Sequence, residues 1–155
     1  MKRIFIFFCL INSLLFVACS SGDETPATET VETVYPDSLL AWRINIDSMV
    51  MIRERLVPDS AITITRIING LNQSYPEVHI NFIKQSGDTL FVDIPDAAYL
   101  GEQMGDAGAA AWFADAAINL TSVAGVNFVS FKMDEHSHAA STIIGREKYK
   151  EWKRQ

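Results

Sequence analysis

The densest group of side chains able to bind a metal ion is Asp134-Glu135-His136-Ser137-His138. If the strand expected before it continued, His136 and His138 would share a face, because alternate residues of a strand point the same way. Two imidazoles with a carboxylate such as Asp134 are ligands that Zn²⁺ and Cu²⁺ accept. The alternative is a solvated loop after the last strand, which the lack of a third well-placed ligand favours. Asp134, His136 and His138 are therefore metal candidates.

Catalytic motifs are not visible elsewhere in the chain. It contains no Gly-x-Ser-x-Gly, no His-Glu-x-x-His and no Gly-rich phosphate loop. Asp93 and Asp96 could form a carboxylate pair, and Tyr99 and Trp112 could line a ligand cleft. A strand edge for Asp93, a turn for Asp96, and core packing or partial exposure for the two aromatic residues explain them more simply. We therefore expect no enzyme activity and no cofactor.

The first residues are typical of an export signal. Lys2 and Arg3 precede an almost wholly apolar run, residues 4–17, which is too short to span a membrane. Phe16-Val17-Ala18-Cys19 resembles the lipobox of bacterial lipoproteins, in which the chain is cut before a cysteine that becomes lipidated; Phe16 departs from the usual Leu or Val. An ordinary signal peptide cut at the same point is the alternative.

We predict a lipoprotein signal peptide at residues 1–18 and lipid attachment, including palmitate, at Cys19. Two or more acyl chains hold a protein firmly on a membrane. The expected location is the cell envelope, facing the periplasm or on the outer-membrane surface. Residues 19–38 are rich in Ser, Thr, Glu and Pro and are predicted to form a flexible acidic tether.

The acidic charge of the chain argues against nucleic acid as a partner. Without residues 1–18, 11 of the 13 basic residues and all 19 acidic residues remain, a formal net charge of −8. Binding of nucleic acid requires a basic surface. We therefore expect no nucleic-acid partner.

Four Asp-Ser/Thr-apolar triplets resemble the O-glycosylation pattern of exported Bacteroidota proteins. Asp-Ser pairs are also common at turns and helix caps, without any sugar. All four triplets lie at predicted turns or element ends. The candidate acceptors are Ser38, Ser48, Ser60 and Thr89.

The folded part is expected to begin with a hairpin and a helix. Trp42, Ile44 and Ile46 alternate with polar residues, which predicts a half-buried strand. A turn at Asp47-Ser48 leads to a second strand over residues 49–57. A helix is predicted over 61–71, capped by Asp59 or Ser60, because its apolar residues recur at helical spacing. These are Ile64, Ile67, Ile68 and Leu71.

The rest is organised around a strand, a helix and a strand. Alternation at Val78, Ile80 and Phe82 predicts a strand that is joined by the turn 86–88 to a strand over 89–94. A loop over 96–105 follows, then a helix over 109–123. That helix is expected to face the sheet through Phe113, Ala116, Ala117 and Leu120.

The second half of that unit is predicted to close the sheet. Gly125 is placed as the left-handed residue that ends the helix. The closing strand, 126–133, is expected to turn Val129, Phe131 and Met133 to one face and Phe128 to the other. Residues 136–155 are predicted to be a polar, basic tail with a short frayed helix at its end.

Leu90-x-Val92-Asp93-Ile94, the helix ending at Leu120-Thr121 and Val129-x-Phe131 together resemble the GerMN (sporulation and spore germination) domain. Glu135 departs from the Gly that the family usually has there. The resemblance implies a GerMN-like domain at 39–135 with an α+β fold, a mixed sheet of four to five strands and two helices on it, akin to ring-building motifs. It implies no enzymatic activity.

The sequence leaves two functions open. The first is a non-enzymatic interaction or assembly module of the cell envelope, which would bind an envelope protein or form a homo-oligomer. The second is a lipoprotein that binds a small ligand through the Tyr99 loop, or a metal through His136 and His138.

Overall fold

The computed structural model describes residues 35–54, 56–136 and 138–155. The predicted signal peptide, Cys19 and most of the predicted tether lie outside the described residues. None of the described helices is both long and apolar enough to cross a membrane. The elements follow in the order β1 (Trp42–Asn45), β2 (Val50–Arg53), η1 (Asp59–Ala61), α1 (Ile64–Ser74), β3 (Asn81–Ser86), β4 (Thr89–Asp93), η2 (Tyr99–Gln103), α2 (Gly105–Leu120), β5 (Phe128–Lys132), β6 (Thr142–Gly145), η3 (Arg146–Tyr149) and β7 (Lys153–Arg154).

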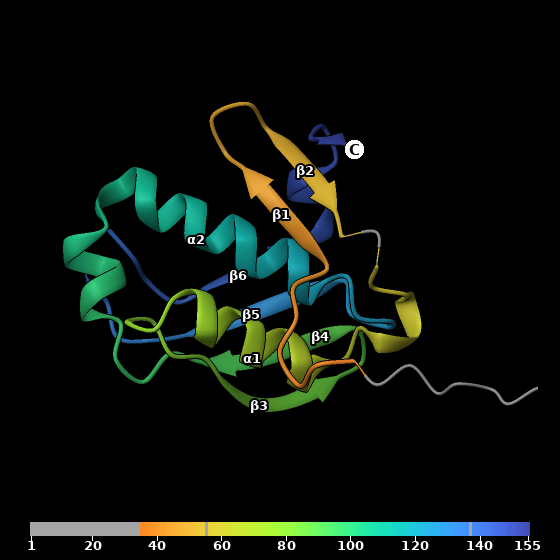
Figure 1. Cartoon of the computed structure of the whole chain (residues 1–155). Helices are drawn as coiled ribbons and strands as arrows, with labels where there is room; N and C mark the ends of the chain where they lie inside the picture. The colour runs from red at the N-terminus through yellow and green to blue at the C-terminus, as the bar shows by residue number, and fades with distance from the viewer. Residues whose placement is uncertain (1–34, 55, 137) are drawn as a thin grey trace, which may run out of the picture. The chain divides into compact units, whose positions relative to one another are not determined.

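A mixed four-stranded sheet with the order β3-β4-β5-β6 supports the fold (Figure 1). The pairs β3–β4 and β5–β6 are antiparallel, and β4 and β5 are parallel. Parallel neighbours need a long crossover connection, and α2 provides it here. The predicted strand–helix–strand unit and the α+β class, with two helices on a small mixed sheet, are confirmed.

A second sheet of three strands has the order β1-β2-β7. β1 and β2 form the predicted hairpin, with Trp42 opposite Arg53 and Asn45 opposite Val50. β2 ends at Arg53, so the prediction of a strand as far as residue 57 is wrong at that end. The next N–H group, that of Glu54, turns back to donate to the carbonyl of Ala41 at 3.0 Å.

The prediction of a polar tail over residues 136–155 is wrong. β6 pairs with β5, and β7 pairs in parallel with β2, so the last residues belong to both sheets. Ile144 and Tyr149 are buried, and the expected frayed helix is the short 3-10 helix η3. Strands of four and two residues carry too few side chains for a periodic signal.

The first helix, α1, has the predicted apolar face: Ile67, Ile68 and Leu71 are buried. Its predicted cap is wrong, because Asp59 and Ser60 lie in the separate 3-10 helix η1. Thr63 caps α1 instead, and its side chain accepts a hydrogen bond from the N–H group of Arg66 at 3.3 Å.

The second helix, α2, begins and ends earlier than predicted. The expected loop before it contains η2, a π-helix, and Gly105 then starts α2 with a φ of 65°. α2 ends at Leu120, and its terminal carbonyl groups are capped by Thr121 and Ser122. Gly125 has the expected left-handed φ, 80°, but it closes the following turn and is not the helix cap.

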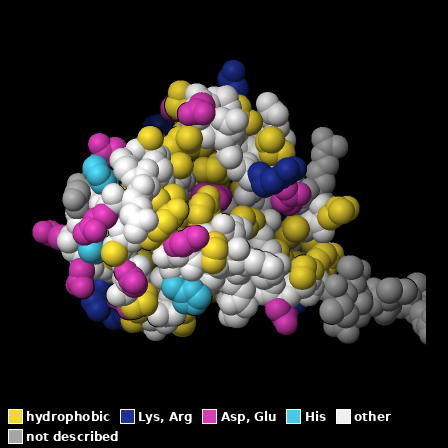
Figure 2. Space-filling view, turned by 60° about the vertical axis from the view of Figure 1, so that its left-hand side comes forward, with side chains coloured by type: hydrophobic (Ala, Val, Ile, Leu, Met, Phe, Trp, Pro, Cys, Tyr) yellow, Lys and Arg dark blue, Asp and Glu magenta, His cyan; other side chains and the backbone are white. Residues whose placement is uncertain are grey.

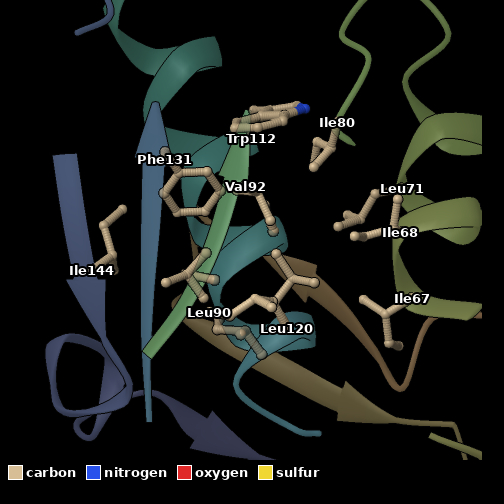
Figure 3. Packing of buried hydrophobic residues seen from close by; sticks show 14 of the residues in the cluster. Ile67, Ile68, Leu71, Ile80, Leu90, Val92, Trp112, Leu120, Phe131 and Ile144 are labelled. Carbon is tan, nitrogen blue, oxygen red and sulfur yellow. The ribbon is translucent and has the colours of Figure 1, made fainter. Parts of the chain in front are cut away.

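The hydrophobic core lies between the four-stranded sheet and the two helices. Figure 3 shows Ile67, Ile68 and Leu71 of α1 directed toward Leu90 and Val92 of β4. α2 is buried on several sides, because it packs on the sheet and also against β1. Trp112, Phe113 and Phe131 meet edge to face, with ring centroids 5.2 to 5.8 Å apart.

The outer strand, β3, departs from the predicted alternation. Val78 and Ile80 are buried but precede the strand, whereas Phe82 is 52% exposed. All six residues of β3 are exposed, and its register to β4 shifts between Phe82 and Lys84. A bulge of this kind bends an edge strand and disturbs its ladder, so the period of two does not continue through it.

Candidate functional site

The metal candidates do not form a common site. The strand that would have aligned them, β5, ends at Lys132. His136 pairs with Glu102 through Nδ1 at 3.2 Å, and His138 pairs with Asp106 through Nδ1 at 2.7 Å. Figure 2 shows acidic and histidine side chains interspersed at the left of one face. The described residues contain no group of three or more His, Cys, Asp or Glu able to hold a metal ion.

The two histidine pairs dock the segment after β5 onto η2, through Glu102, and onto the first turn of α2, through Asp106. The N–H group of His138 donates to the carbonyl of Gly101 at 2.9 Å. A Cβ atom added at Gly101 would lie 2.1 Å from the Cβ of His136. The close approach of His136 to η2 therefore requires glycine at position 101. The geometry therefore explains both histidines by packing and hydrogen bonding within the fold.

The residues weighed as catalytic or cleft-lining have separate partners or environments. Asp93 pairs with Lys132 at 3.5 Å across β4 and β5, and Asp96 accepts a hydrogen bond from the N–H group of Ala98. Trp112 is fully buried, and its Nε1 has no hydrogen-bond partner among the described residues. Tyr99 is half-buried in η2. The core position predicted as the simpler explanation for Trp112 is confirmed.

The sugar-acceptor candidates occupy different environments. Ser48 and Ser60 are exposed, in the β1–β2 turn and in η1. Ser38 is half-buried and donates to Gln73 at 2.7 Å, and Thr89 is the half-buried first residue of β4. Ser48 and Ser60 are the accessible pair, and attachment of sugar at any of the four stays a prediction.

Sequence reasoning missed a buried polar cluster formed by Tyr75, Asp115 and Asn119. The Tyr75 hydroxyl donates to Asp115 Oδ2 at 2.8 Å, and Asn119 Nδ2 donates to Asp115 Oδ1 at 2.8 Å. Asn119 Oδ1 accepts from the N–H groups of Ala41 and Trp42 at 2.8 and 2.9 Å. The available signal was two polar residues four apart on an otherwise apolar helix.

Burial dominates the electrostatics of this cluster. It raises the pKa of Asp115 above its ordinary value, against the lowering effect of the hydrogen bonds from Tyr75 and Asn119. Burial and the nearby Asp115 carboxyl also raise the pKa of Tyr75. Because its polar atoms are engaged with one another and with the backbone at the start of β1, the cluster joins the hairpin to α2.

Several exposed apolar side chains lie on the face of the four-stranded sheet that the helices leave open, which we call the outer face. The row Lys84–Phe91–Ser130–Ile143 crosses all four strands in register. Ile143 is 65% exposed and Phe128 is 42% exposed. A hollow of about 440 Å³ lies over this face, bordered by Ile83 among others.

No family model, no curated protein and no solved structure matches this chain.

Proposed function

We propose that this chain is a lipid-anchored protein of the cell envelope whose α+β domain is a non-enzymatic interaction module. The observation that carries the proposal is the outer face of the four-stranded sheet. Exposed apolar patches on monomeric proteins commonly mark sites of association. Phe128 and Ile143 are exposed there although the core is complete on the other side of the same strands.

The occupant we propose for the outer face is a second copy of the chain. The central row Phe91–Ser130–Ile143 is uncharged, as the centre of an interface usually is. The surrounding residues carry both signs of charge, with Lys84 beside Phe91 and the pair Asp93–Lys132 one row further on. A twofold interface brings a patch against itself, so a patch with both signs of charge is complementary to its own copy.

The face is a better candidate than the β3 edge for this contact. β3 combines a register shift with the exposed Lys84. Bulges and lysines are the devices by which edge strands avoid pairing with other chains. The β3 edge is thus protected against strand addition, whereas the outer face carries an apolar centre.

Cysteine crosslinking of the full chain in intact cells tests the contact. The natural cysteines are Cys9 and Cys19, and both lie outside the described residues. Ser130→Cys places a thiol at the centre of the outer face. Thr65→Cys is the matched control, because Thr65 is exposed on α1. We expect a short bismaleimide to give a band of twice the chain's mass with Ser130→Cys and none with Thr65→Cys.

Two results would contradict the dimer. One is equal crosslinking of both variants, which would indicate random encounter in the membrane. The other is that the Ser130→Cys variant gives no homodimer band, whether it is crosslinked to a different protein or to none. Loss of the homodimer band on adding Ile143→Asp to Ser130→Cys would strengthen the assignment to this face.

The anchor part of the proposal rests on the lipobox-like Phe16-Val17-Ala18-Cys19, which lies outside the described residues. A lipid at Cys19 would hold copies in one plane and raise their effective concentration. Labelling cells with radioactive palmitate tests it. We expect label on the natural chain and none on Cys19→Ala, and label that persists in Cys19→Ala would contradict the anchor.

The resemblance to GerMN domains is consistent with an assembly role, since it implies an envelope protein without enzymatic activity. A small mixed sheet with two helices on it accords with that expectation. A family relationship remains part of the proposal. Metal binding is not proposed, because the histidines bind separate carboxylates.

A further inference from the structure

A cleft of about 370 Å³ lies between the three-stranded sheet, the turn after α2 and the C-terminal elements. It is bordered by three arginines, Arg53, Arg146 and Arg154, and by one acidic residue, Asp59. The chain as a whole is acidic, with a formal net charge of −6. A gathering of arginines in such a chain points to an anionic ligand, because guanidinium groups match the oxygens of carboxylates and phosphates.

The three guanidinium groups differ in how many of their hydrogen-bond donors are already paired within the protein. Arg53 is held by the carbonyl groups of Ala41 and Val57 and by Asp59, and its guanidinium lies 5.4 Å from the centre of the Trp42 ring. The Arg146 guanidinium makes one long hydrogen bond, 3.4 Å, to the carbonyl of Val126. Arg154 makes no side-chain hydrogen bond to another described residue. Arg146 and Arg154 therefore keep donors for a ligand.

Backbone donors add to the arginines. Ala124 and Gly125 border the cleft and are exposed, and neither N–H group donates to another described residue. Gly125 has a φ of 80°. Free N–H groups in a tight turn with a left-handed residue are a common cradle for anions.

The arginines are not needed to neutralise the end of α2. A helix C-terminus carries partial negative charge on unpaired carbonyl groups, which cations can satisfy. Here the N–H and hydroxyl groups of Thr121 and Ser122, with the N–H group of Val123, already donate to the last four carbonyl groups of the helix. The three guanidinium groups donate to none of these carbonyls.

We propose that this cleft binds a small organic anion through its carboxylate or phosphate group. Arg146, Arg154 and the turn at 124–125 hold the oxygen atoms, and Arg53 adds charge from one side. The organic part lies against the apolar wall that Trp42, Met51 and Ile118 provide. This site is independent of the outer face and of any dimer.

Titration of the full chain in detergent, followed by NMR of its tryptophan indole groups, tests the site. Trp42 Nε1 donates to Ser122 Oγ at 2.8 Å in the cleft wall, whereas Trp112 is buried in the core. We expect inorganic phosphate to shift the Trp42 signal saturably and to leave that of Trp112 in place. Phenyl phosphate should bind about tenfold more tightly, because its ring is buried against the apolar wall.

Arg146→Gln with Arg154→Gln should weaken binding of both probes at least about tenfold, the effect of losing charge-assisted hydrogen bonds. Arg43→Gln with Lys150→Gln removes the same charge at two exposed residues outside the cleft and should leave binding unchanged. Thermal unfolding of both variants checks that they fold.

Three outcomes would overturn the proposal. The first is that neither probe shifts Trp42 at millimolar concentration. The second is an equal loss of binding in the two double variants, which would indicate bulk electrostatic attraction. The third is a Trp42 shift with phosphatidylglycerol vesicles alone, which would assign the arginines to a membrane surface. A monomeric chain that still binds phosphate would contradict the dimer and leave this site intact.

Discussion

The two faces of the four-stranded sheet come from the same strands but differ in how far their apolar residues are buried. On the inner face, Leu90 and Val129 are fully buried against the helices. On the outer face, Phe128 and Ile143 are next to buried residues in sequence and yet remain 42% and 65% exposed. Successive side chains of a strand point to opposite faces. Apolar residues are therefore required on one face for folding, and on the other they are free to serve association.

The comparison predicts its largest effect for two phenylalanines of β5. Phe131 is 1% exposed and packs against Trp112 and Phe113, whereas Phe128 lies on the outer face. Phe131→Ala should lower the free energy of unfolding by about 3–5 kcal/mol, because it leaves a cavity in the core. Phe128→Ala should change it by less than about 1 kcal/mol. Urea unfolding of both variants measures the difference. Equal losses of unfolding free energy would show that the two faces do not differ in their contribution to stability.

The second largest effect is expected in the polar cluster formed by Tyr75, Asp115 and Asn119. Asn119→Ala would leave the N–H groups of Ala41 and Trp42 without their acceptor. An unsatisfied buried donor costs about 1–3 kcal/mol, so we expect a loss of about 2 kcal/mol or more. Asn69→Ala, which removes an exposed bond to the carbonyl of Asp37, is the control and should cost much less. A similar cost for both would show that the cluster is not needed to hold the hairpin.

A smaller, pH-dependent effect is expected from Asp115. Burial raises the pKa of this carboxyl in the folded chain above its unfolded value, so the folded state prefers the protonated form. The stabilisation is fully present below the unfolded pKa and is lost as the pH rises through the folded one. The melting temperature of the natural chain should therefore rise relative to that of Asp115→Asn as the pH falls from 7 toward 4. A difference that is constant over this range would contradict the shift.

The smallest effect on stability, and the sharpest on association, is expected for Ile143→Asp. Ile143 is 65% exposed, so the free energy of unfolding should change by less than about 0.5 kcal/mol. A charge at the centre of the proposed interface should nevertheless abolish the homodimer, because burying an unpaired charge is costly. Light scattering of the full chain in detergent measures this, with Thr65→Asp as the control. A dimer that survives Ile143→Asp would exclude the outer face as its contact.

Local patterns predicted the centre of the fold well. The β1–β2 and β3–β4 hairpins, the buried face of α1 and the inward residues of β5 follow from periodicity and turn residues. Predictions were wrong for the cap of α1 and for the regularity of β3. Thr63 caps α1 in place of Asp59 or Ser60, and β3 is bulged where alternation favoured a regular strand.

None of the candidate sites could be predicted whole, because their parts are far apart in the chain. The outer face combines residues of β3, β4, β5 and β6, and the last of these strands lay in the predicted tail. The arginine cleft brings together Arg53 of β2, Arg146 of η3 and Arg154 of β7. Conversely, the adjacent His136 and His138 are drawn to different carboxylates.

By itself, the sequence determined the α+β class and which side chains of the central elements are buried, because burial follows the period of a strand or helix. The tertiary structure decided the rest. The pairing of β6 and β7, the cluster around Asn119 and the gathering of the arginines depend on contacts between distant segments. Such contacts form when the whole core closes, and no local pattern of residues encodes them.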